Sequence, residues 1–322
     1  MNSRKRIKVN THSNGQRLDV FLASELDASR SQIQKLIKEN LVMVDGELPK
    51  KSGDKISNGD KIEIHVASAK KEEGRRRKGN AKKLKLPKIK IIEEAADYLV
   101  VEKPVGLLTH PTMKNEHDSL SSILTAQYPE LKKIGDDPAR PGIVHRLDKD
   151  ASGLLVIART QKMFNHLKEQ FKKRTINKEY LALAHGKVAK DWDEIKFPIA
   201  RGKNSERMAA LPFTSRGEKT IEGKEALTEF LVEKRFVNFT LLKVKIHTGR
   251  MHQIRVHLLA YNHPLVGDPL YFQKKRKDKW DKKLGRLFLH CTKLSFKDLN
   301  GETQTFQSPL PKNLAEFLTH LK

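Results

Sequence analysis

The sequence predicts an α+β protein with a largely antiparallel sheet, preceded by a small α/β module. Apolar stretches with strand character outnumber those with helical spacing, and several of the strands follow one another as in hairpins. A run rich in Lys and Arg separates the two parts and has almost no large apolar residue, so it cannot form a core of its own. We therefore expect a first domain at residues 15–67, a basic linker at 68–88 and a larger domain at 89–322, which a chain of 322 residues can accommodate.

Local patterns predict two helices and two strands in the first domain. Apolar residues recur at helical spacing in residues 18–26 and again in residues 33–37. The β-rich residues 41–44 run into Asp45-Gly46, which is a strong hairpin signal. Residues 61–66 alternate between polar and apolar side chains, as a strand with one buried face does.

The larger domain contains apolar patterns of both kinds. Its strands are predicted at residues 98–102, 154–158, 178–188, 225–235, 239–247 and 287–296, and its helices at residues 119–128, 163–171, 251–261 and 314–321. Pro and Gly recur between residues 191 and 224, with Arg and Lys among them, which predicts an irregular basic insertion. The alternative for this stretch is an ordinary long connection.

The composition favours a polyanionic partner. The chain has 64 Lys and Arg against 39 Asp and Glu, a formal net charge of +25. Cationic side chains displace condensed counterions from phosphate, so nucleic acid is the first candidate and a membrane surface the second. No run of about 18 apolar residues is present, so no membrane span is expected. The single cysteine, Cys291, allows no intrachain disulfide, which fits a reducing cytoplasm.

A charged cluster enters the most apolar strand of the chain. The segment HRLDKD, residues 145–150, is followed by Ser152-Gly153 and the apolar run 154–158. Charged groups on a loop that a rigid strand positions are a common arrangement for catalysis. The alternative is an N-capping Asp148 flanked by surface charges.

Three further stretches accompany this cluster along the chain. They are KPVGL at residues 103–107, KEY at 178–180, and TGRMHQIRVH at 248–257 with HPL and GD before residue 269. Together with HRLD and Ser152-Gly153, these blocks resemble the motifs of the RluA family of RNA pseudouridine synthases, in the family's order. Two positions depart from the family's pattern, Ala151 where Thr is usual and Phe272 where Gly is common. Neither departure removes a catalytic group.

The resemblance implies a mixed, mainly antiparallel sheet with a central RNA cleft, and an enzyme that isomerises uridine to pseudouridine in RNA. The first domain resembles the S4 RNA-binding domain, with Ser29-Arg30-Ser31 and Asp45-Gly46 at matching places. This pair of domains resembles the family's ribosomal members, so the expected substrate is large-subunit (23S) ribosomal RNA. A transfer-RNA pseudouridine synthase of the same family and a non-catalytic rRNA-binding assembly factor are the alternatives.

The implied reaction assigns the central residues. The N1–C1′ bond that breaks and the C5–C1′ bond that forms lie within one nucleotide, so no cofactor is expected, and the sequence has no Walker loop or GxGxxG motif. A carboxylate has to act at the sugar, by attacking C1′ or by removing the 2′ proton, and the resemblance gives this role to Asp148. It also pairs Asp148 with Arg255, because Arg can hold a carboxylate through a bidentate contact.

Substrate contacts are implied for further residues. Arg146, together with its neighbour His145, is expected to contact the substrate, Arg146 by occupying the space that a flipped nucleotide leaves. Tyr180 is expected to stack on the flipped base or to help move the C5 proton, and its alternative is a buried core tyrosine.

In the S4-like module, Arg30, Lys35 and Lys38 are expected to face RNA phosphates; the alternative is a solvated helix face. The histidines at 247, 252 and 257 lack the i, i+4 spacing of a helical metal site, so no metal is expected. We expect a cytoplasmic monomer.

Overall fold

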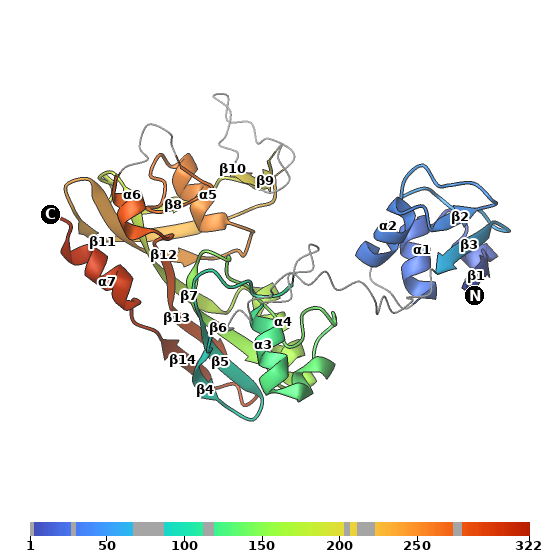
Figure 1. Ribbon diagram of the computed structural model, residues 1–322, viewed down its shortest axis with the longest axis horizontal. Helices are drawn as coiled ribbons and strands as arrows, with labels where there is room; N and C mark the ends of the chain where they lie inside the picture. The colour runs from blue at the N-terminus through green and yellow to red at the C-terminus, as the bar shows by residue number, and fades with distance from the viewer. Residues whose placement is uncertain are drawn as a thin grey trace, which may run out of the picture. The chain divides into compact units, whose positions relative to one another are not determined.

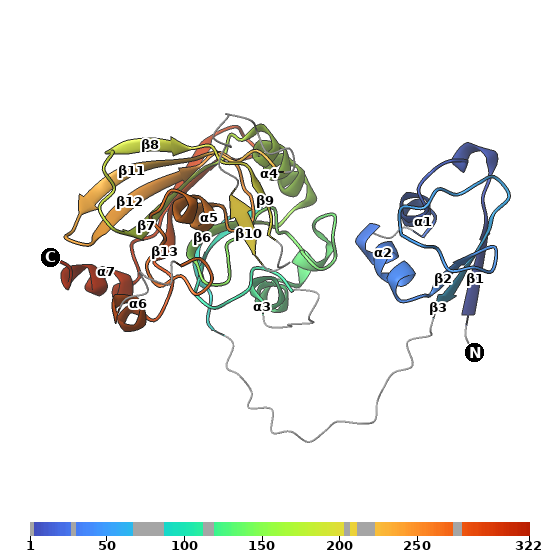
Figure 2. The same cartoon turned by 90° about the horizontal axis from the view of Figure 1, so that it is seen from above.

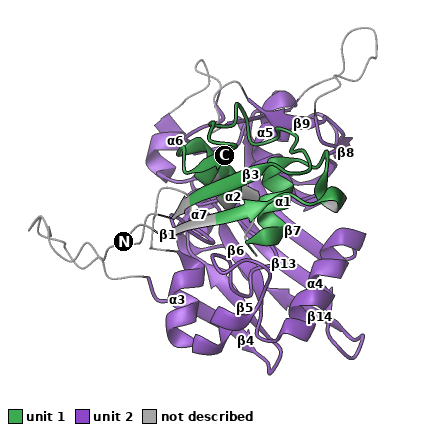
Figure 3. Cartoon of the chain, turned by 90° about the vertical axis from the view of Figure 1, so that its right-hand side faces the viewer, with its two compact units in different colours: residues 1–84 green, residues 85–322 purple. Residues whose placement is uncertain are grey.

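The computed structural model describes residues 3–26, 30–66, 87–111, 119–202, 207–210, 223–272 and 279–322. The chain divides into two compact units, Met1–Leu84 and Lys85–Lys322 (Figure 3). The division falls inside the predicted linker. Among the described helices, none is long and apolar enough to cross a membrane.

The first unit is a three-stranded antiparallel sheet packed against two helices. Its strand order is β1-β3-β2, with β1 at Ser3–Lys8, β2 at Val42–Val44 and β3 at Lys61–Val66. The helices are α1 (Leu18–Glu25) and α2 (Arg30–Lys38), and a short 3₁₀ turn, η1, spans Thr11–Ser13. Leu22, Ile33 and Ile62 are fully buried between the helices and the sheet, so the apolar spacing correctly predicts both helices.

Two features of this unit differ from the sequence prediction. Strand β1 lies before residue 15, where the first domain was expected to begin, and its sequence SRKRIK is mostly cationic. Its pairing with β3 depends on backbone hydrogen bonds, which the apolar pattern does not report. The predicted turn at Asp45-Gly46 forms, with φ of 51° and 83°. The turn joins Val44 and Glu47 by a single bridge and does not lead into a second strand of a hairpin. Strand β2 pairs with β3.

The second unit is built on a mixed sheet of nine strands (Figure 1). The strand order is β4-β5-β6-β13-β7-β12-β11-β8, with β14 also paired to β13; only the β6–β13 pair is parallel among the pairs of this sheet. The predicted α+β class with a mainly antiparallel sheet is confirmed. The strands are β4 (Lys90–Glu94), β5 (Tyr98–Lys103), β6 (Ser152–Ala158), β7 (Asn177–His185), β8 (Trp192–Ile195), β11 (Thr228–Arg235), β12 (Phe239–Ile246), β13 (Leu289–Lys297) and β14 (Thr303–Gln307).

Alternation along β7 shows how the sheet is covered on both faces. Ala182 and Ala184 point into the larger core, whereas Leu183, between them, joins a second apolar cluster. That cluster contains Phe317 of α7 (Lys312–Thr319), which packs against α6 (Lys279–Leu284). The sheet therefore has apolar side chains on both faces, which explains strands that read as nearly continuous apolar runs.

The remaining helices border the larger core. They are α3 (Leu120–Gln127), the 3₁₀ helix η2 (Pro129–Lys133), α4 (Gln161–Lys173) and α5 (Gln253–Ala260). Helix α4 begins where Thr160 Oγ1 accepts a hydrogen bond from the Met163 N–H, and it buries Met163 and Leu167. Helix α5 lies beside β10, a strand of the separate hairpin β9 (Ile199–Arg201) and β10 (Met208–Ala210) (Figure 2).

Several short or polar elements were not predicted. The irregular structure expected for residues 191–224 is wrong for the described part of that stretch, because β8 joins the sheet edge and β9 pairs with β10. These strands have three or four residues each, too few for an alternating pattern to be visible. Strands β4 and β14 and helix α6 were also missed, and their exposed positions carry charged and polar residues.

The strand that follows the charged cluster needs a glycine at its start. All seven residues of β6 are buried, and Gly153 has φ of +122°. A Cβ at this position would lie 2.4 Å from the carbonyl oxygen of Cys291 and 2.5 Å from its nitrogen. The close approach of β6 to β13 therefore excludes any side chain at Gly153.

We expect Gly153→Ala to lower the free energy of unfolding by roughly 2–4 kcal/mol, from backbone strain at positive φ and overpacking against Cys291. Gly301→Ala is the matched control, since Gly301 also has positive φ, +84°, but no atom within 4 Å of the added Cβ. The control should lose only about 1 kcal/mol. Urea denaturation of both variants measures the difference, and equal losses would show that β13 yields at this contact.

Candidate active site

Asp148 lies on a turn that leads into β6, and this turn is fixed from two sides. The Ala151 N–H donates to the Asp148 carbonyl at 3.1 Å, which closes the turn. On the preceding residue, Thr109 Oγ1 donates to the Leu147 carbonyl at 3.0 Å and accepts from the Leu147 N–H at 3.3 Å. The loop between β5 and α3 therefore holds the backbone next to Asp148.

A buried lysine completes this support. Lys103, at the end of β5, has no exposed surface, and its Nζ donates to the carbonyls of Pro104 and Leu107 at 2.8 Å and of Lys149 at 3.2 Å. Burial lowers the pKa of Lys103 to about 7, although the charges of Asp148 and Asp150 act in the opposite direction. Lys103 thus ties the KPVGL loop to the turn that carries Asp148.

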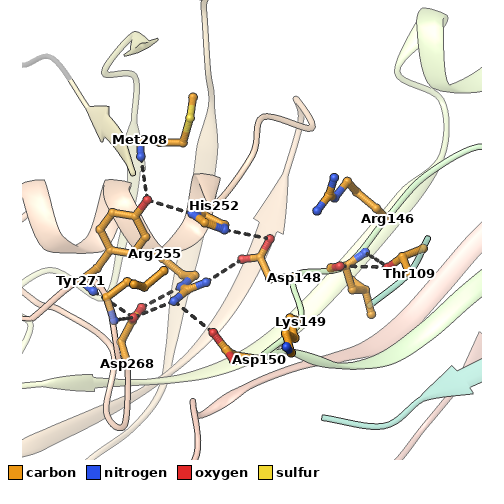
Figure 4. Close-up of polar contacts among 12 residues, drawn as sticks. Thr109, Arg146, Asp148, Lys149, Asp150, Met208, His252, Arg255, Asp268 and Tyr271 are labelled. Atoms are coloured by element: carbon orange, nitrogen blue, oxygen red, sulfur yellow. Dashed lines mark hydrogen bonds and ion pairs between the residues drawn. The ribbon is translucent and has the colours of Figure 1, made fainter. Parts of the chain in front are cut away.

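Arg255 joins this turn to a second carboxylate (Figure 4). Its Nε and Nη2 bind Asp268 Oδ2 and Oδ1 at 2.8 and 2.7 Å, a bidentate pair whose side chains are 1% and 0% exposed. Its Nη1 reaches Asp148 Oδ2 at 3.3 Å, and Nη2 lies 3.6 Å from Asp150 Oδ2. The predicted meeting of Arg255 and Asp148 is present, but the bidentate contact expected there is made with Asp268 instead.

The charge of Arg255 is secured by its surroundings. Burial alone lowers the pKa of Arg255, but the hydrogen bonds and charge of Asp268, with the charges of Asp148 and Asp150, raise it above its ordinary value. The guanidinium of Arg255 therefore stays positively charged. Asp148 therefore has a cation at one oxygen, while its other oxygen lies toward His252.

A cavity of about 410 Å³ opens in front of Asp148. Tyr180, from β7, is 3% exposed and forms part of the wall together with Leu289. Burial raises the pKa of Tyr180 well above its ordinary value, so the phenol is neutral. The structure thus places a carboxylate and an aromatic ring at one cavity; the stacking role of Tyr180 stays a prediction.

The two residues before Leu147 differ in their settings. Arg146 lines the cavity, and its Nη1 donates to His110 Nε2 at 3.3 Å, while His110 Nδ1 donates to the Pro111 carbonyl at 3.0 Å. The ring of His145 also lines the cavity, but its Nε2 accepts the Val156 N–H of β6 at 3.0 Å. Arg146 is therefore oriented by a neighbour, and His145 has a structural contact beside its predicted substrate contact.

The residues predicted to bind phosphate are only partly described. Lys38 is exposed near the end of α2, whereas the side chains of Arg30 and Lys35 lie outside the described part of the structure. Lys203, Arg216 and Lys219 of the basic insertion also fall outside the described residues. The phosphate contacts of Arg30, Lys35 and Lys38 stay predictions.

The three histidines at 247, 252 and 257 each have a hydrogen-bond partner within the protein. His247 Nε2 is 2.8 Å from Glu229, His257 binds Thr228 and the Phe197 carbonyl, and His252 binds Tyr271. Within the described ranges, no group of three or more His, Cys, Asp and Glu side chains is placed to hold a metal ion.

Sequence reasoning missed Asp268, Lys103 and Tyr271 as parts of the site. Each belongs to or adjoins a block that carried the resemblance, but none was given a role. The sequence did contain a signal for Asp268. A buried Arg needs a carboxylate partner, and Asp268 in Gly267-Asp268 is an acidic residue that follows α5, the helix of Arg255.

Comparisons with known proteins agree with this geometry. The family model described as RNA pseudouridylate synthase matches residues 97–260, and the S4 domain model matches residues 16–62. An RNA pseudouridine synthase of Aquifex aeolicus is 43% identical over 80% of this chain and 77% of its own. The ribosomal large subunit pseudouridine synthase D of Haemophilus ducreyi is 34% identical over 96% of this chain and 91% of its own. Human RNA pseudouridylate synthase domain containing 1 superposes with a TM-score of 0.57, at 25% identity, over 72% of this chain and 88% of its own.

The buried pair predicts a large effect of a conservative change. Arg255→Lys should lower the free energy of unfolding by about 2 kcal/mol or more, because Lys cannot make the two contacts to the fully buried Asp268. Arg255→Ala should cost about 3–5 kcal/mol, since it leaves that carboxylate without a partner. Arg235→Lys is the control, as Arg235 is a surface residue bound to backbone carbonyls and to the exposed Asp191. Denaturant unfolding measures all three, and a loss below 1 kcal/mol for Arg255→Lys would contradict the role of the bidentate pair.

Proposed function

We propose that this chain, which belongs to the RluA family of RNA pseudouridylate synthases, isomerises uridines in large-subunit ribosomal RNA with Asp148 as its catalytic carboxylate. One observation carries the assignment of Asp148. Among the carboxylates that the buried, permanently charged Arg255 contacts, Asp148 is the one that lines the cavity, and Arg255 reaches it through Nη1. Asp268 is bound to the same arginine, but its side chain has no exposed surface.

The chemistry is a rearrangement within one nucleotide. The N1–C1′ bond breaks with its electron pair going to the uracil, the base turns, and C5 then bonds to C1′ and gives up its proton. Asp148 takes part at the sugar, either by forming a temporary ester at C1′ that C5 displaces, or by removing the 2′ proton and returning it. Both routes need an ionised carboxylate, and Arg255 places a positive charge 3.3 Å from Asp148 Oδ2.

The cavity walls suit a nucleotide taken out of its helix. Tyr180 supplies an aromatic side chain to the cavity that Asp148 also lines, and Leu289 adds an apolar one. Arg146, oriented by His110, is a cation at the same cavity that can replace interactions lost when the base leaves the stack. A monomer as the active form is part of the proposal.

Three features support ribosomal RNA as the substrate class. The net charge of +25 suits a polyanion, an S4 domain precedes the catalytic unit, and the relative from Haemophilus ducreyi is named for the large ribosomal subunit. An enzyme acting on this RNA works where the ribosome is assembled, so cytoplasmic location is part of the proposal.

Asp148→Asn should abolish the modification while leaving RNA binding nearly intact, because affinity is spread over many phosphate contacts. The experiment maps pseudouridines in large-subunit ribosomal RNA from cells that lack the protein and carry either wild type, Asp148→Asn or Asp150→Asn. Asp150 is the matched control, a carboxylate on the same turn that is 34% exposed and farther from Arg255 Nη atoms than Asp148. Wild type and Asp150→Asn should restore the same sites.

Two outcomes would contradict the proposal separately. Restored sites with Asp148→Asn would remove Asp148 as the catalytic carboxylate. Sites restored in transfer RNA instead of ribosomal RNA would show that the substrate class is wrong while leaving the chemistry in place.

The first unit and the linker should supply affinity rather than chemistry. Deleting residues 1–86 should weaken binding to ribosomal RNA and flatten its salt dependence, by about 0.7–0.9 in the log–log slope for each lost phosphate contact. Residues 87–322 have their own core and should still release tritium from C5-labelled uridine at high enzyme concentration. Binding and tritium release are measured together over a salt series. An unchanged slope would show that the deleted residues do not touch phosphate, and a folded but inactive fragment would show that they belong to the catalytic unit.

A further inference from the structure

The two oxygens of Asp148 have different neighbours (Figure 4). Oδ2 is 3.3 Å from Arg255 Nη1, and Oδ1 is 3.9 Å from His252 Nε2. Asp148 and His252 both line the cavity, with side chains that are 15% and 14% exposed. The imidazole therefore stands at the oxygen that the arginine does not contact.

The other ring nitrogen is held by a chain of hydrogen bonds that starts in β10. The Met208 N–H donates to Tyr271 Oη at 2.8 Å, and Tyr271 Oη is 2.8 Å from His252 Nδ1. Among the described residues, His252 Nδ1 is the acceptor within hydrogen-bond distance of Tyr271 Oη, so we assign the hydroxyl proton to a hydrogen bond with Nδ1. Nδ1 is then the acceptor, and the ring proton is on Nε2, the nitrogen that faces Asp148.

The backbone around His252 and Tyr271 is also held by local contacts. His252 is the N-cap of α5 with φ of 55°, a conformation that residues other than Gly adopt uncommonly. The ring of Tyr271 meets the His252 ring edge-on, at 5.4 Å between centroids. Asp268 Oδ1 accepts the Leu270 and Tyr271 N–H groups at 2.9 Å, so the residue that holds Arg255 also places Tyr271.

The electrostatic surroundings agree with a neutral ring. Burial lowers the pKa of His252, and the charges of Arg255 and Arg146 act in the same direction, while Asp148 and Asp268 oppose them. A neutral imidazole with its proton on Nε2 can donate one hydrogen bond to Asp148 without adding a second full positive charge beside Arg255.

We propose that His252 is a positioning residue, which donates a hydrogen bond from Nε2 to Oδ1 of Asp148 when the target nucleotide is bound, with Tyr271 and the backbone of Met208 fixing its tautomer. The inference rests on the proposed catalytic role of Asp148. The observed 3.9 Å is about 1 Å longer than a hydrogen bond, and such contacts commonly shorten in the substrate complex. Arg255 and His252 then hold both oxygens, which fixes the rotation of the carboxylate toward the sugar.

Two substitutions of His252 separate this role from a structural one. In His252→Gln the side-chain amide nitrogen reaches about as far as Nε2, so a donor to Asp148 is kept. In His252→Asn the amide reaches only as far as Nδ1, so that donor is lost, but Asn fits both the positive φ and the N-cap position better than Gln. A structural role predicts that Asn is the better replacement, and the positioning role predicts Gln.

The measurement is the single-turnover rate of tritium release, with enzyme in excess over C5-tritiated total RNA from cells that lack the protein. His252→Asn should lower the maximal rate on the order of 10- to 100-fold, the usual effect of a misplaced reacting group. Its half-saturating concentration should change less than about twofold, since phosphate contacts are untouched. His252→Gln should stay within about fivefold of wild type. Urea unfolding should show that the Asn variant is folded.

Tyr271→Phe tests the tautomer. It keeps the aromatic ring and removes the hydroxyl, so the ring proton of His252 is free to move to Nδ1, which turns a lone pair toward Asp148. The rate should fall about tenfold in the His252 background and change little in the His252→Gln background, which has no tautomer to set.

Each outcome of these measurements either supports or overturns the positioning role of His252. An Asn variant as active as the Gln variant, or more active, would overturn the proposal, as would an equal loss from Tyr271→Phe in both backgrounds. Because total RNA is the substrate, these comparisons hold whichever RNA class is modified. Full activity of Asp148→Asn in the same assay would instead remove the proposed catalytic carboxylate, which is a separate failure.

Discussion

The buried pair of Arg255 and Asp268 is the interaction on which the site depends. Two charges with almost no exposed surface are costly to bury, and two hydrogen bonds of 2.8 and 2.7 Å offset that cost. Asp268 is further held by backbone N–H groups, so its carboxylate is fully occupied by fixed donors. This arrangement aims the remaining nitrogen of Arg255 at Asp148. The cavity-facing carboxylate thereby has a cation at Oδ2, while Oδ1 has no contact with Arg255 and lies 3.9 Å from His252 Nε2.

The family resemblance correctly predicted that Asp148 and Arg255 meet, but not how they are joined. The motif places an Arg opposite an Asp, and a bidentate contact was the natural expectation; in the structure Asp268, 13 residues after Arg255, takes that contact. Which carboxylate receives the bidentate contact of Arg255 depends on how α5 and the following turn pack. The spacing of residues along the sequence does not show this packing. His252 shows the same limit. Its spacing from His247 and His257 gives no information about its contacts, which arise from a left-handed backbone and from Tyr271.

Predictions of the fold succeeded where buried residues recur at the regular spacing of a helix or strand. The stripe of Met163 and Leu167 in α4 and the apolar runs of β6 and β7 were visible because one or both faces meet a core. The misses share a different cause. Strand β1 is cationic, β8 to β10 have three or four residues, and β14 alternates only between exposed and half-buried positions. These segments become strands because a neighbouring strand offers free backbone groups, a property of the partner and not of the segment.

Charge acts on two length scales in this protein, and the two are nearly independent. The excess of 25 positive charges acts over the Debye length, about 8–10 Å, and draws phosphate to the surface. Inside the site three carboxylates, Asp148, Asp150 and Asp268, surround one guanidinium within 3.6 Å. That cluster has a net negative charge, but the cavity wall around Asp148 also carries the guanidinium groups of Arg140, Arg146 and Arg250. In the proposed reaction only a base and its sugar need to reach Asp148, and these arginines can contact the phosphates on either side of that nucleotide. The carboxylate and the cations of the cavity therefore act on different parts of the same nucleotide.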